Sequence, residues 1–100
     1  MRYLGNMVTI KQGVTAMAKK LIKRTQTGVR IESSLLKVLK GLAEYTELSL
    51  GDLLEGIVLH SFEGKAPFSA ETQSVITQLK NVYGCELTAA DSHMLQEDSA

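Results

Sequence analysis

The sequence predicts a small, mainly helical fold with one short β-strand, assembled from two copies of the chain. Three observations lead to this prediction: a stretch of alternating side chains, capped segments with helical periodicity after it, and a composition that gives only a thin core. The 100 residues are 44% hydrophobic but only 5% aromatic, with no Trp. Small chains bury a small share of their surface. A second copy would enlarge the core.

The predicted strand covers residues 25–31, TQTGVRI. Its alternation places Thr27, Val29 and Ile31 on one side and Gln26, Gly28 and Arg30 on the other. A strand without a neighbour leaves backbone N–H and C=O groups unpaired. We therefore expect antiparallel pairing with the same strand of a second copy, which would bury Val29 and Ile31 and present Gln26 and Arg30 outward twice.

Two amphipathic helices are predicted after the strand. Ser33 or Ser34 can begin the first, and Ser49 can begin the second, because a hydroxyl at the N-cap accepts a hydrogen bond from a free backbone N–H. Asp52, three residues after Ser49, completes an aspartate variant of the capping box. The apolar stripes are Leu35, Leu36, Leu39, Leu42 and Ala43 in the first helix, and Leu50, Leu53, Leu54, Ile57, Val58 and Phe62 in the second, which stops near Gly64.

A third helix is predicted between Ser69, as N-cap, and Gly84, as the stop. One face carries Val75, Ile76, Leu79, Val82 and Tyr83. This face either packs on the dimer core or binds in a groove of another protein. A further short helix is predicted from Thr88, followed by an acidic end that we expect to fray.

The order TGVRI, a Leu-rich helix and ELSLGDLL, with 18 positions from Ile31 to Ser49, resembles the Arc/MetJ-like ribbon-helix-helix family of DNA-binding proteins. The resemblance covers about 38 residues, 25–62. It implies a homodimer whose intermolecular two-stranded antiparallel ribbon enters the DNA major groove, and a transcriptional regulator such as a repressor. The sequence leaves open whether such dimers associate further on DNA.

Charge is distributed unevenly along the chain. Residues 1–31 contain seven Lys or Arg and no acid, whereas residues 32–100 contain four Lys and all eleven acids. A net charge of zero therefore combines a +7 segment with a −7 segment. This pattern is typical of a protein that binds a polyanion. The alternatives are a solvated basic tail and a membrane-surface segment, and the lack of aromatic anchors disfavours the membrane.

The DNA interpretation assigns base reading to the outer side of the strand. Arg30 can donate to guanine and Gln26 can bond adenine, each good pair contributing roughly 1–3 kcal/mol of discrimination. Thr27 lies on the inner side of the strand, but its methyl and hydroxyl groups suit either the inner side or the outer side. Gly28 supplies no side chain, so it either permits close approach of the backbone or removes one base contact.

Phosphate binding is assigned to two other places. Lys23 and Arg24, just before the strand, are the expected side-chain partners. The start of the second helix adds the backbone N–H groups of Leu50 and Gly51, in a turn held by Ser49.

The sequence divides into a basic arm, partly disordered or in a short helix (1–24), the dimerisation and DNA-binding unit (25–64) and a helical extension with an acidic tail (65–100). We expect no enzyme activity, metal or cofactor, because no His, Cys and carboxylate group has ligand or catalytic spacing. The single Cys85 fits a reducing cytoplasm. No apolar run is long enough for a membrane span.

Two alternatives to DNA binding remain. The chain is an interaction module or antitoxin-like protein that holds a partner protein through residues 69–83 and the acidic tail, or its basic arm serves only solubility. In the first case, changes at Leu79 and Val82 should weaken binding of the partner protein. Weak binding to DNA that is insensitive to salt would indicate the second.

Overall fold

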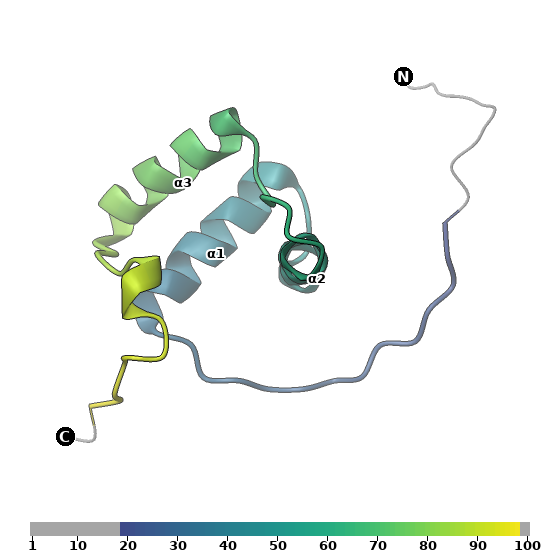
Figure 1. Cartoon of the computed structure of the whole chain (residues 1–100), viewed down its shortest axis with the longest axis horizontal. Helices are drawn as coiled ribbons and strands as arrows, with labels where there is room; N and C mark the ends of the chain where they lie inside the picture. The colour runs from purple at the N-terminus through teal and green to yellow at the C-terminus, as the bar shows by residue number, and fades with distance from the viewer. Residues whose placement is uncertain (1–18, 99–100) are drawn as a thin grey trace.

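The computed structural model describes residues 19–98, which form three α-helices and one short 3₁₀ helix. The helices are α1 (Ser33–Thr46), α2 (Leu50–Phe62) and α3 (Ala70–Tyr83), and the 3₁₀ helix is η2 (Ala89–Asp91). α1 and α3 lie side by side, while α2 crosses them at one end and the chain before α1 runs as a long extended segment (Figure 1).

α1 begins one residue after a cap that the sequence analysis did not predict. The Glu32 carboxylate accepts hydrogen bonds from the Leu35 N–H at 2.9 Å and from the Ser34 hydroxyl at 2.7 Å. Ser33 is therefore the first helical residue, and the cap is Glu32 instead of Ser33 or Ser34. At the other end Glu47 adopts a left-handed conformation, with φ 59°, which turns the chain toward α2.

The predicted caps of the other two helices are present. The Ser49 hydroxyl accepts from the Asp52 N–H at 3.1 Å, and the Ser69 hydroxyl accepts from the Thr72 N–H at 3.2 Å. α3 ends at Gly84, whose φ of 66° lies in the left-handed region that favours glycine. These hydrogen bonds satisfy backbone groups that the helices themselves leave unpaired.

The core lies between α1 and α3, with α2 closing one end. Its buried members are Leu42, Ala43 and Leu53, with Leu39, Ile57, Phe68, Ile76 and Leu79 partly buried around them. A Cβ added at Gly41 would lie 3.1 Å from Leu79 Cδ2, so glycine permits a close approach of the two helices. The apolar face of α3 thus packs on α1 within the chain.

The predicted strand is absent, and the predicted ribbon-helix-helix fold with a β-ribbon is wrong for the described residues, which are all-helical. Residues 25–31 are extended, but within residues 19–98 they form no strand pairing. Val29, expected on a buried side, is 75% exposed. The glycine at position 28 also disfavours a strand. The alternating sequence of residues 25–31 is therefore not enough to produce strand pairing within the described residues.

The basic arm predicted for 1–24 is described only in part. Residues 1–18 lie outside the described range, so the short helix expected there falls mostly beyond it. Residues 19–24 are not helical and are exposed.

Candidate nucleic-acid interface

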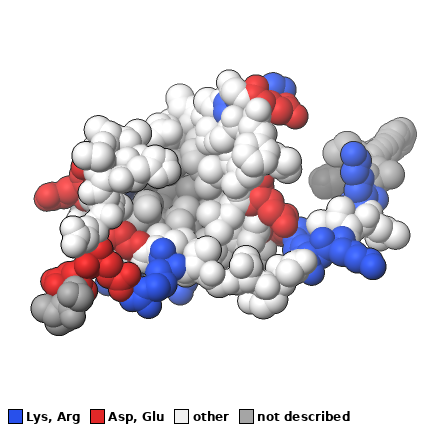
Figure 2. Space-filling model, turned by 60° about the horizontal axis from the view of Figure 1, so that its bottom comes forward, with Lys and Arg blue, Asp and Glu red and all other residues white. Residues whose placement is uncertain are grey.

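The extended segment 19–30, which we call the basic segment, carries five cations and no acid: Lys19, Lys20, Lys23, Arg24 and Arg30. All of its side chains are exposed. Figure 2 shows Lys and Arg side chains along this segment where it stands away from the helices, and acidic side chains in contact with basic ones at the opposite end of the same face. Within residues 19–98, Lys19, Lys20 and Lys23 form no ion pair.

Arg24 lies against the first turns of α2. Its Nε donates to Glu55 at 2.8 Å, and its Nη2 donates to Glu55 at 2.8 Å and to Asp52 at 2.9 Å. The hydrogen bond with Arg24 lowers the pKa of Glu55, and the same contact raises the pKa of Arg24. The Asp52 carboxylate thus bonds Arg24, and only the Ser49 half of the predicted capping box is present.

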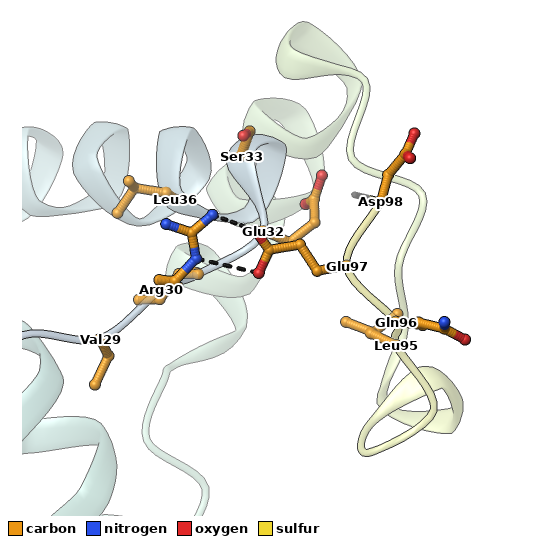
Figure 3. Close-up of a pocket in the computed structure, with 10 residues that line it drawn as sticks. Val29, Arg30, Glu32, Ser33, Leu36, Leu95, Gln96, Glu97 and Asp98 are labelled. Carbon is orange, nitrogen blue, oxygen red and sulfur yellow. Dashed lines mark hydrogen bonds and ion pairs between the residues drawn. The ribbon is translucent and has the colours of Figure 1, made fainter. Parts of the chain in front are cut away.

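Arg30 pairs with the C-terminal tail. Its Nε donates to the Glu97 carboxylate at 3.1 Å and its Nη2 donates to the other oxygen of the same group, in a two-pronged contact (Figure 3). The hydrogen bond with Arg30 lowers the pKa of Glu97. Arg30 nevertheless stays 82% exposed, so the ion pair lies at the surface of the protein.

The predicted base-reading residues share one extended stretch but have no common face of a ribbon. Gln26, Thr27 and Gly28 are exposed. A Cβ added at Gly28 would meet nothing within 4 Å, so no close approach within the described chain requires this glycine. Arg30 lies further along the stretch, where the chain enters α1.

The predicted phosphate-binding residues are partly brought together. Because Arg24 bonds Asp52 in the first turn of α2, it lies close to the helix start formed by Ser49, Leu50 and Gly51. The first N–H groups of a helix have no partner inside it. Lys23 precedes Arg24 directly and is exposed. Arg24 and the N-terminus of α2 therefore lie in one region, together with the carboxylates of Asp52 and Glu55.

α2 exposes much of its apolar surface. Only Leu53 is buried, while Val58, Leu59 and Phe62 are 44%, 62% and 81% exposed. α2 packs on α1 but makes no direct helix packing with α3. By contrast, α3 uses Ile76 and Leu79 inside the core, and its exposed apolar side chains are Val82 and Tyr83 near its end.

The described residues contain no group of three or more His, Cys, Asp or Glu side chains placed to hold a metal ion. Within the same part of the chain, no helix has both the length and the apolar character to cross a bilayer. Cys85 is buried as a free thiol.

Sequence reasoning missed the acidic partners of both arginines. Glu55 and Glu97 are separated from Arg24 and Arg30 by 31 and 67 positions, and the acidic end was expected to fray. The uneven charge was a signal that opposite charges would meet, but it did not identify the pairs. The exposed face of α2 had a clearer signal, because Leu59 adds an apolar residue outside the predicted stripe.

No protein-family model, curated protein or solved structure matches this chain.

Proposed function

We propose that the chain is a homodimeric DNA-binding protein of the cytoplasm, a transcriptional regulator whose basic segment contacts duplex DNA. The observation that carries the proposal is the exposed stretch of five cations without an acid in residues 19–30. The described remainder, residues 31–98, has four Lys and eleven acids. Arg24 and Arg30 pair with acids of that remainder, and the other three cations form no ion pair within residues 19–98, so their charge is available to a polyanion.

The lysines of the basic segment have the role of phosphate contacts. Lys19, Lys20 and Lys23 are exposed and form no ion pair within residues 19–98, so their contacts with phosphates break no such pair. An extended backbone lets successive side chains reach successive phosphates. Gln26 and Arg30 are the side chains for base edges, because an amide and a guanidinium bond adenine and guanine respectively.

Arg24 has a different role in this proposal. Its bonds to Asp52 and Glu55 hold the basic segment against the first turns of α2. The segment is thereby oriented beside the free N–H groups of Leu50 and Gly51, where an anion is favoured. Arg24 thus positions the DNA-contacting residues and is itself neutralised.

The homodimer is proposed from the small core and the exposed face of α2. Five apolar side chains are buried within residues 19–98: Val38, Leu42, Ala43, Leu53 and Cys85. Leu59 and Phe62 stay on the surface. A core of this size contributes little free energy of folding, and burying two large side chains adds roughly 1.5–3 kcal/mol each. A second copy of the chain is present wherever the chain is made, so we assign a second copy to the exposed face of α2.

DNA binding is tested by a salt titration of affinity for a labelled mixed-sequence duplex. The double variant Lys20→Ala, Lys23→Ala should weaken binding and reduce the slope of log K against log salt by about two, since each phosphate contact contributes about 0.9. Lys37→Ala, Lys40→Ala removes the same charge from α1 and is the control. Equal losses in both variants, or no binding by the unmodified chain at low salt, would contradict the proposal.

Dimerisation is tested by sedimentation equilibrium of the full chain. Phe62→Asp should shift the molecule toward monomer, because a carboxylate cannot be buried without a partner. Val82→Asp, at a side chain 72% exposed on α3, introduces the same charge elsewhere and should leave the dimer intact. A monomeric unmodified chain, or equal effects of the two variants, would refute the assigned interface.

A further inference from the structure

The C-terminal tail returns to the basic segment although the two are far apart in sequence. Residues 95–98 lie beside residues 29–33, where α1 begins (Figure 3). Here Glu97 accepts from Nε and Nη2, one of the two donor edges through which Arg30 could bind a guanine or a phosphate. The tail therefore bonds a proposed DNA-contacting side chain through the same atoms.

The path of the tail is fixed by contacts upstream of Glu97. Buried Cys85 anchors the chain after α3, and the Lys80 ammonium donates to the Leu87 carbonyl at 2.6 Å. η2 follows, where the Thr88 N–H donates to the Asp91 carboxylate at 2.8 Å. These contacts aim the last residues back toward the start of α1. Glu97 meets Arg30 a few residues beyond these contacts.

We propose that this contact is autoinhibitory: Glu97 occupies the Nε–Nη2 edge of Arg30 in the free protein and offsets its charge, and DNA must displace the tail to use that edge. The inference rests on the proposed DNA binding. Glu97 is an intramolecular competitor, so it lowers affinity for DNA without any change in the helices. Both partners are well exposed, at 82% and 63% of their side chains. Such pairs are weak, so a phosphate can replace the carboxylate.

The experiment compares Glu97→Gln with Glu86→Gln in the full chain, using anisotropy of a labelled mixed-sequence duplex. Both variants remove one negative charge, and Glu86 forms no ion pair within the described residues. Glu97→Gln should bind DNA about two- to five-fold tighter than Glu86→Gln, the range for a surface ion pair. This gain should vanish when both variants also carry Arg30→Ala.

A second measurement reports the contact without DNA. The Glu97 carboxyl is titrated by NMR in the unmodified chain and in Arg30→Ala, and loss of the arginine should move its titration to higher pH. No movement would show that the contact does not form and would overturn the inference. If the unmodified chain binds DNA but Glu97→Gln and Glu86→Gln bind alike, autoinhibition fails and DNA binding stands. If none of the variants binds duplex at low salt, the proposed function fails and autoinhibition with it.

Discussion

The α1 and α3 pair differs sharply from the part of the chain made by α2 and the basic segment. In the pair, the apolar side chains on the facing sides of the helices pack together and Leu42 is 2% exposed. In the other part, Val29 and Phe62 are 75% and 81% exposed, and the cations lie on an extended backbone. Both parts have capped helices, so local structure does not explain the difference. The difference in exposure comes from how much of each part packs against another part of the chain.

This difference indicates where stability and binding reside. Free energy of folding comes chiefly from buried apolar surface, which is concentrated between α1 and α3. Apolar and charged side chains left on the surface are available to other molecules. The pair therefore acts as a scaffold, while α2 and the basic segment hold the surfaces to which we assign the second copy and DNA.

The largest expected effect comes from emptying the centre of the scaffold. Leu42→Ala should lower the free energy of unfolding by about 2–5 kcal/mol, because it removes a fully buried side chain and leaves a cavity. Val82→Ala, on the exposed surface of α3, should change it by no more than about 0.5 kcal/mol. Urea denaturation followed by circular dichroism measures both. Similar values for the two variants would show that the pair is not the stable part.

A matched pair of glycines compares the packing of the two parts more finely. Gly56→Ala on α2 should raise the free energy of unfolding by about 0.5–1 kcal/mol, since alanine favours a helix and the new Cβ meets nothing within 4 Å. Gly41→Ala on α1 should gain less, because its Cβ would lie 3.1 Å from Leu79 Cδ2. Thermal unfolding of the two variants gives the comparison. An equal gain at both positions would mean that α1 and α3 are not closely packed at Gly41.

The parts of the fold that depend on nearby residues could be predicted from sequence. Ser49, Ser69 and Gly84 mark helix ends because a cap needs only a side chain and backbone groups within a few positions. The Glu32 cap was missed because Ser33 and Ser34 beside it are the commoner cap residues. Local physics therefore located the helices to within about a residue or two.

The parts that depend on distant residues could not be predicted. Alternation in 25–31 satisfies one condition for a strand, but a strand also needs a partner, and the described chain supplies none. Glu97 meets Arg30 across 67 positions through the path of α3 and η2, which no local pattern encodes. The candidate site was recognised by its residue types in the basic segment. Its acidic neighbours became visible only in three dimensions.

The smallest expected effect tests the junction between the two parts, where the basic segment enters α1 at Glu32. The Ser34 hydroxyl and then the Leu35 N–H stabilise the Glu32 carboxylate and lower its pKa below the ordinary value of 4.5. A lowered pKa in the folded state means that the charged carboxylate adds stability at pH values above 4.5. That contribution should disappear as pH falls through the lowered pKa.

Glu32→Gln keeps an acceptor oxygen but removes the charge, so the unmodified chain should be the more stable of the two at neutral pH. Their difference in free energy of unfolding should shrink below pH 4.5 and vanish in stronger acid. Glu44→Gln, exposed on α1 beyond its first turn, controls for the loss of one acidic side chain. A difference that stays constant with pH would show that the charge on Glu32 does not cap the helix. The junction would then be held by the packing of α1 on α3 alone.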